Sequence, residues 1–117
     1  MKLHYSILRF HPIASSSTPI TLGILFHEPS LDFREFRYTH DLSRLSQLYP
    51  DVDIEIVEKL LRGIREDIKS ERFYSKGFDT EDYTRFYIND FHFGDIERVE
   101  CNDLDEMIEQ IVQRKWR

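Results

Sequence analysis

The order of its hydrophobic periodicities constrains the fold of this chain more than any other feature. Three strand-length segments, 3–10, 20–26 and 31–38, come first and mix aliphatic, β-branched and aromatic residues. Apolar residues at steps of three and four then run from about 51 to 69, and a strand-like segment precedes an apolar helical stripe over 104–112. This order predicts an α+β fold, a mainly antiparallel sheet with helices packed on one face.

The first two strand-like segments form a predicted hairpin. Residues 20–26 are continuously apolar, as in a buried central strand, and residues 14–19 have the composition of a mobile polar turn. The alternation in 31–38 slips midway, so we expect a bulge in this third strand. Residues 91–101 fit either a hairpin or one strand with a bulge at Gly94.

Helix-capping signals mark three predicted helices. Asp41 stands where the N-cap of a short helix should be, and the following helix, about 51–69, has acids in its opening turns and bases toward its end. Asn102 or Asp103 is the expected cap of the last helix, with Glu106 in capping-box position relative to Asp103. The pattern does not decide whether residues 81–87 form a helix or a strand.

Length and composition indicate a single domain over residues 1–117. Nine Phe, six Tyr and one Trp supply bulky apolar groups for a core that needs neither a disulfide nor a metal. The single Cys101 agrees with a reducing compartment. Because no apolar run approaches the roughly 20 residues of a membrane span, and the start lacks the apolar region of a signal peptide, we expect a cytoplasmic protein without membrane contact.

Acidic residues are concentrated in one third of the chain. The formal net charge is −6, but residues 79–109 hold eleven acids against two arginines, a net charge of −9 that leaves +3 for the rest. This balance argues against direct binding of nucleic acid through a basic field. The segment either is a solvated surface or presents carboxylates to a basic partner. The candidate partner-binding residues are Asp79, Glu81, Asp82, Asp90, Asp95, Glu97, Glu100 and Asp103.

Four segments carry a family resemblance: Tyr-Ser-Ile-Leu-Arg-Phe at 5–10, Leu-Gly-Ile-Leu-Phe at 22–26, Asp-Leu-Ser-Arg-Leu at 41–45, and Asn-Asp-Leu-Asp-Glu-Met at 102–107. In them the chain resembles domain-of-unknown-function family 3037, small bacterial domains often encoded beside HipA-like kinases. The resemblance implies a small accessory or regulatory protein that meets a larger partner. The chain departs from the family pattern in the first hairpin, and the resemblance transfers no catalytic residue.

Other residue groups are compatible with chemistry but do not establish it. Asp90, His92 and Asp95 have a spacing that a metal site or an acid–base pair would also show, and Cys101 lies in an acidic stretch that disfavours a nucleophilic thiolate. We expect no catalytic, metal-binding or cofactor-binding residue and no cofactor. Whether the histidines converge cannot be derived from the sequence; they are His4, His11, His27, His40 and His92.

We therefore expect a non-enzymatic regulatory module that docks on a larger protein through an acidic surface or a sheet edge. One alternative is a phage-type inhibitor that imitates nucleic acid to block a defence nuclease, which requires carboxylates on one surface. Another is a small metal-dependent hydrolase or nuclease, in which Asp90, His92 or another histidine lies near further acids. A homodimer through a strand edge or the last helix, anchored by Trp116, is also open.

Overall fold

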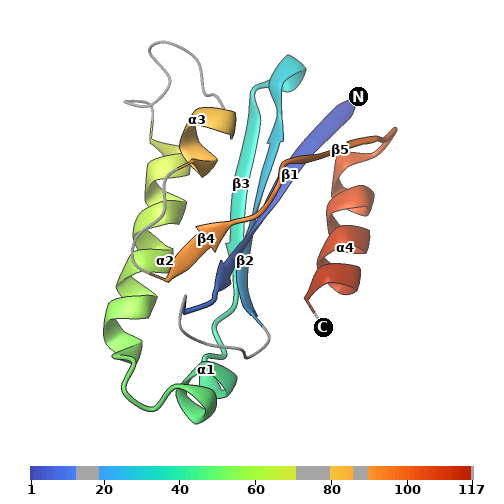
Figure 1. Ribbon diagram of the computed structural model, residues 1–117. Coiled ribbons are helices and arrows are strands. Elements are labelled where there is room, and N and C mark those ends of the chain that lie inside the picture. The colour runs from blue at the N-terminus through green and yellow to red at the C-terminus, as the bar shows by residue number, and fades with distance from the viewer. Residues whose placement is uncertain (13–18, 71–79, 86–89, 117) are drawn as a thin grey trace.

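A five-stranded antiparallel sheet forms the centre of the protein (Figure 1). The computed structural model describes residues 1–12, 19–70, 80–85 and 90–116. β2 lies between β3 and β1, and the far side of β1 pairs with both β4 and β5. The strands are β1 (Lys2–Phe10), β2 (Ile20–Glu28), β3 (Phe33–Tyr38), β4 (Phe91–Phe93) and β5 (Glu97–Glu100).

Helices cover both faces of this sheet, with α2 on one side and α4 on the other (Figure 1). The helices are α1 (Ser43–Leu48), α2 (Ile54–Lys69), α3 (Thr80–Thr84) and α4 (Leu104–Lys115), with a short 3-10 turn at Pro29–Leu31. The α+β class and the antiparallel sheet are confirmed. The prediction that all helices pack on one face is wrong, because α4 packs on the face opposite α2.

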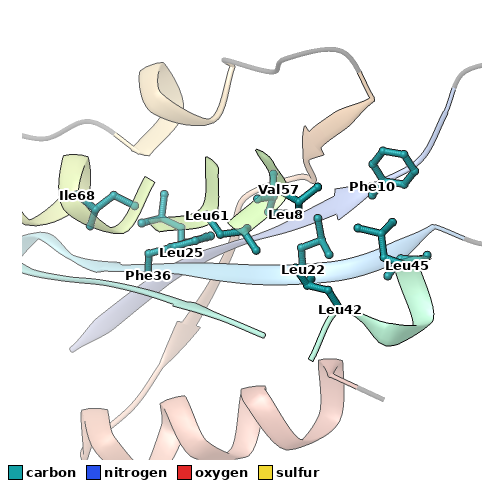
Figure 2. Close-up of a cluster of buried hydrophobic side chains, with 11 residues drawn as sticks. Leu8, Phe10, Leu22, Leu25, Phe36, Leu42, Leu45, Val57, Leu61 and Ile68 are labelled. Atoms are coloured by element: carbon teal, nitrogen blue, oxygen red, sulfur yellow. The ribbon is translucent and has the colours of Figure 1, made fainter. Parts of the chain in front are cut away.

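The core is accordingly divided into two clusters. The α2-side cluster, shown in Figure 2, consists of Leu8, Phe10, Ile20, Leu22, Leu25, Phe36, Leu42, Leu45, Val57, Leu61 and Ile68. The α4-side cluster consists of Leu3, Tyr5, Ile7, Ile24, Phe26, Cys101, Ile108 and Ile111. Since residues of both clusters alternate along β1 and β2, these two strands are buried on both faces.

A β-bulge in β2 sets which residues face each cluster. The pairing with β1 shifts between Leu8↔Gly23 and Arg9↔Thr21, so Leu22 is an extra residue on β2. The pairing of β2 with β3 has no such shift from Gly23 to the end of the strand. The prediction of a bulge in the segment 31–38 is therefore wrong, because the bulge lies in β2.

The same bulge explains an apparent conflict in the apolar pattern of β2. Ile20 and Leu22 belong to the α2-side cluster, whereas Ile24 and Phe26 belong to the α4-side cluster although all four positions are even-numbered. In a regular strand, residues two apart point to the same face. The extra residue changes this phase, so the strand supplies large side chains to both clusters.

A second irregularity joins β4 to β5 along one sheet edge. Phe93 pairs with Leu8 and Glu97 pairs with Tyr5, so three intervening residues of this edge face two residues of β1. The Gly94 N–H donates a 2.8 Å hydrogen bond to the carbonyl of Ile7. Of the two alternatives for residues 91–101, one strand with a bulge at Gly94 is the observed arrangement.

Of the predicted helix caps, Asp103 is confirmed, because its side chain accepts a 3.2 Å hydrogen bond from the Glu106 N–H at the start of α4. α2 begins at Ile54; its N-cap residue is Asp53, one of the acids expected in its opening turns, which accepts a 3.0 Å bond from the Glu55 N–H. Asp41 was predicted as the N-cap of α1, but it lies one residue before the observed N-cap, which is Leu42. Residues 80–84 are helical, which resolves the ambiguity for the start of 81–87.

Some sequence-based expectations fall outside the described residues. Residues 14–18 of the predicted polar turn and the candidate acid Asp79 are among them. Within the described part of the chain, no helix combines the length and apolar character needed to cross a membrane.

Two glycines form a matched pair for testing the packing of β2. A Cβ atom on Gly23 would lie 2.5 Å from Cζ of Phe36 and 3.0 Å from the carbonyl oxygen of Arg37, whereas a Cβ on the exposed Gly63 of α2 would meet nothing within 4 Å. Gly23→Ala should lower the free energy of unfolding by about 1–3 kcal/mol through overpacking. Gly63→Ala should raise it by about 1 kcal/mol. Urea unfolding measures both, and an unchanged midpoint for Gly23→Ala would contradict the close approach to Phe36.

Candidate functional site

Exposed carboxylates follow the sheet edge formed by β4 and β5. Four of the eight candidate acids lie there, and we call them the acidic edge: Asp95, Glu97, Glu100 and Asp103. Among the described strands, β5 pairs with β1 alone, so no described strand covers its other side. The structure thus brings half of the predicted acids together at one sheet edge.

The acidic edge presents its carboxylates to both faces of the sheet. Glu97 pairs in register with Tyr5, which belongs to the α4-side cluster, and its carboxylate accepts a hydrogen bond from the Tyr5 hydroxyl. Glu100 pairs with Lys2, and the odd spacing between Glu97 and Glu100 directs their side chains to opposite faces. The acidic edge is therefore a ridge with charge on both flanks, and not a flat acidic surface.

Neighbouring groups hold parts of this edge in place. A carboxylate oxygen of Glu100 lies 3.8 Å from the amino group of Met1, and its second oxygen lies 3.8 Å from Nζ of Lys2. Both ion pairs are exposed, so each contributes little to stability and leaves the carboxylate accessible to water. Asp103 caps α4. Asp95 is exposed within the bulge.

A shallow groove separates α3 from the bulge. It has a volume of about 350 Å³ and is lined by Glu81, Thr84, Arg85, Phe93, Gly94, Asp95 and Ile96. Glu81 accepts a 3.1 Å hydrogen bond from the guanidinium of Arg98 in β5. The Ser6 hydroxyl donates a 2.8 Å bond to the carbonyl of Gly94, which fixes the opposite wall. Two predicted acids, Glu81 and Asp95, therefore meet across one groove next to the acidic edge.

The remaining predicted acids do not join this group. Asp79 lies outside the described residues, and Asp82 is in α3, where only its backbone is described. Asp90 lies just before β4, and its carbonyl accepts a 2.8 Å hydrogen bond from the N–H of His11, which directly follows β1. Asp90 is therefore at the end of β1 that is far from Glu97 and Glu100.

Two of the five histidines converge, at the end of the sheet near α3. His4 and His27 are register partners on β1 and β2, and their rings meet edge to face with centroids 6.1 Å apart. His27 is only 5% exposed, and its Nδ1 lies 2.7 Å from Oγ1 of Thr80. Burial is the main cause that lowers the pKa of both imidazoles below the ordinary value of 6.5. The other three, His11, His40 and His92, lie elsewhere: His40 packs on Tyr38, and His92 pairs with Arg9.

A buried carboxylate at Glu28 lies at the end of β2. Glu28 is 2% exposed and accepts hydrogen bonds from the Ser30 hydroxyl and the Leu31 N–H, each at 2.7 Å. The hydrogen bond from the Ser30 side chain is the main cause that lowers the pKa of this carboxyl. The Glu28 carboxylate thereby holds the turn that leads into β3, in which Asp32 has a left-handed φ of 51°. This residue was missed because a Glu before Pro29 also occurs in ordinary exposed turns.

A second cavity, of about 290 Å³, opens where β2, α1 and the chain's last turn meet. Trp116 and Arg44 line it together with Thr21, Thr39 and Asp41 and several aliphatic side chains. Trp116 also packs against the α4-side cluster. Its role as the anchor of a homodimer stays a prediction.

Metal-ligating side chains do not gather in the described part of the chain. Among those residues, no group of three or more His, Cys, Asp and Glu side chains is arranged to hold a metal ion. Asp90, His92 and Asp95, whose spacing a metal site would also show, are not brought together as a ligand set. The buried Cys101 is unpaired.

Comparison with known proteins identifies a family without an assigned activity. Residues 5–114 match the family model described as "Protein of unknown function (DUF3037)". No curated protein and no solved structure matches the chain.

The contact between Tyr5 and Glu97 makes a testable prediction about ionisation. Burial, followed by the hydrogen bond to the Glu97 carboxylate, raises the pKa of Tyr5 to about 12. Tyr5 should remain protonated at pH 11, where an ordinary phenol with a pKa of about 10 is mostly ionised. Ring chemical shifts measured by NMR across this range report the titration.

Variants of the two edge glutamates test how much the Glu97 carboxylate contributes to the raised pKa of Tyr5. Glu97→Gln removes the negative charge and should lower the pKa of Tyr5 toward its ordinary value. Glu100→Gln, on the other face of the sheet, should leave it unchanged. A Tyr5 phenol that titrates near pH 10 in the wild-type protein would show that the contact is not formed in solution.

Proposed function

The chain belongs to the DUF3037 family of proteins of unknown function, and on that premise we propose that it is a non-enzymatic interaction module that regulates a larger protein partner. The acidic edge is the docking element. A basic, extended segment of the partner adds to β5 as a further strand. The observation that carries this proposal is a sheet edge without a described neighbour that bears carboxylates on both flanks.

The backbone of β5 supplies the hydrogen-bonding groups for such an addition. The Cys101 N–H donates a 2.9 Å bond to the carbonyl of Met1. Because inward- and outward-pointing residues alternate along an antiparallel strand, the N–H and C=O groups of Arg98 and Glu100 point away from β1. An added strand would pair with these groups, as in β-augmentation, where main-chain bonds give affinity and alternate side chains give specificity.

Charge complementarity defines the partner segment. An added strand directs alternate side chains to the two faces of the sheet, and Glu97 and Glu100 offer a carboxylate on each face. Lysine or arginine residues on both sides of the segment would therefore find acidic neighbours. Such complementarity mainly accelerates association and selects the correct partner.

The groove next to the edge suits one long basic side chain of the partner. Phe93 and Ile96 contribute apolar surface, and Asp95 contributes a carboxylate beside that of Glu81, which also pairs with Arg98. An aliphatic stem can cover the apolar surface while the cationic end reaches the acids. Asp95 thus belongs both to the acidic edge and to the groove.

The same geometry favours this proposal over nucleic-acid mimicry. A mimic needs its carboxylates on one surface, as the phosphates of a backbone are presented, whereas Glu97 and Glu100 lie on opposite faces. A metal-dependent hydrolase stays an untested alternative. We place the module in the cytoplasm, because an unpaired cysteine such as Cys101 agrees with a reducing compartment.

A pair of peptides tests the proposed docking mode. The first is Lys-Val-Lys-Thr-Val-Lys, and the second has the same side chains but an N-methyl group on every backbone amide, which removes the N–H donors from both edges of the extended peptide. Titration calorimetry of the full chain should show binding of the first peptide, weaker at higher salt, and a loss of at least about tenfold with the second. Equal binding of both peptides would show attraction by charge alone and would contradict strand addition.

Matched charge reversals locate the site. The double variant Glu97→Lys, Glu100→Lys should lose binding of the first peptide. The control Glu58→Lys, Glu66→Lys changes the net charge equally, at exposed positions on α2, and should retain it within about threefold. If both variants lose binding equally, the overall charge and not the acidic edge is responsible.

A further inference from the structure

We propose that His27, His4 and Thr80 form a pH-sensitive latch, which holds α3 on the sheet at neutral pH and releases it when the imidazoles are protonated. The latch stands on the fold alone. Its consequence for binding, described below, rests on the proposed function, since α3 forms one wall of the groove.

The position of α3 depends on tertiary contacts. It has five residues, far fewer than the roughly 12–15 that an isolated helix needs for marginal stability in water. Its contacts include Thr80 to His27 at 2.7 Å, Glu81 to Arg98 at 3.1 Å, and the ring of Tyr83 to that of Phe93 at 6.1 Å between centroids; Tyr83 also packs against the α2-side cluster. Tertiary anchoring therefore determines where this helix lies.

The anchor at Thr80 is the buried one. Thr80 is 4% exposed and His27 is 5% exposed, whereas the ion pair between Glu81 and Arg98 is open to water and contributes little. A buried hydrogen bond whose partners cannot reach water is costly to lose. The contact between His27 and Thr80 is thus a buried polar link between α3 and the sheet.

Among the described residues, charged groups approach the two imidazoles from several elements. His27 faces His4 from β1, Arg34 from β3 and Asp32 from the preceding turn, with Glu28 on its own strand. His4 is approached by groups of both signs: Lys2 on its own strand, Arg98 from β5, Glu81 from α3 and Glu28 from β2. The acids oppose only part of the combined effect of burial and the cations, so both imidazoles favour the neutral form.

Protonation changes what this site can hold. A charge on either ring would be placed at a site with little solvent and next to the second ring, so the pair cannot accept two protons cheaply. Because the pKa in the folded state lies below the ordinary 6.5, the stability that the neutral pair contributes is complete above pH 6.5 and is lost as the pH falls below it. Detachment of α3 exposes the rings and relieves the cost.

Release of α3 would change the proposed docking surface. Glu81, Thr84 and Arg85 would leave the groove, while the bulge and the acidic edge on β5 would stay in place. If the module docks as proposed, acidification would weaken contacts made in the groove before it weakens those made along the edge.

Amide exchange in the protein without a partner tests the latch directly. NMR protection factors, which are exchange rates corrected for the intrinsic rate at each pH, are measured at pH 7.5 and pH 5.0. The α3 amides should lose protection about tenfold or more at pH 5.0, while those of β2 stay unchanged. Constant protection of α3 between these values would overturn the proposal, whatever the outcome of the peptide experiments.

Three variants distinguish a titrating latch from general loss of stability. His27→Asn keeps a hydrogen-bonding side chain but cannot be protonated, so the pH dependence of α3 protection should fall to the part that His4 contributes. Thr80→Val removes the hydroxyl and should lower α3 protection at both pH values. The control His11→Asn, at the other end of β1, should behave like the wild-type protein. If His27→Asn does not fold, the NMR titration of the His27 ring must coincide with the α3 transition in the wild-type protein, and separate midpoints would contradict the latch.

Discussion

Burial of β1 and β2 on both faces is the constraint on which the rest of the structure depends. The largest fully buried side chains of these strands divide between the two sides, with Leu8 and Leu25 toward α2 and Leu3 and Phe26 toward α4. A sheet with two apolar faces must be covered twice. The helices between β3 and β4 cover one face, and the chain must then cross the acidic edge through β5 before α4 can cover the other.

The distribution of apolar residues predicted the elements but not the side on which α4 lies. The stripe of α4 was recognised, yet a helical stripe does not say which face of a sheet it will meet. The slipping alternation in β3 was misinterpreted for a related reason. Phe33 packs on the α4 side, whereas Phe36 and Tyr38 pack on the α2 side, so two-sided burial and not a bulge breaks the alternation. The true bulge, at Leu22, was hidden in a continuously apolar run where phase cannot be read.

The candidate site was predictable only where it depends on local sequence. The acids of β5 are consecutive enough in sequence that any extended conformation brings them to one edge, and the bulge at Gly94 was one of two stated options. The histidine pair depends instead on the register that sets His4 against His27, and on the approach of Thr80 from 53 positions away in the chain. Neither relation leaves a signal in a single sequence.

The extra residue at Leu22 has a consequence for how this protein can vary. A substitution in β2 changes one side chain, but deletion of a residue from the regular part of the strand changes the face of its neighbours. Deletion of Leu25, for example, would direct Ile24 to the layer of α2 instead of that of α4. Deletion of Leu22 would only restore regular alternation, because Thr21 already pairs with Arg9 and Gly23 with Leu8, so Ile20 and Thr21 would keep their faces. The bulge is therefore the position at which β2 can lose a residue without turning over, with the loss of one buried leucine.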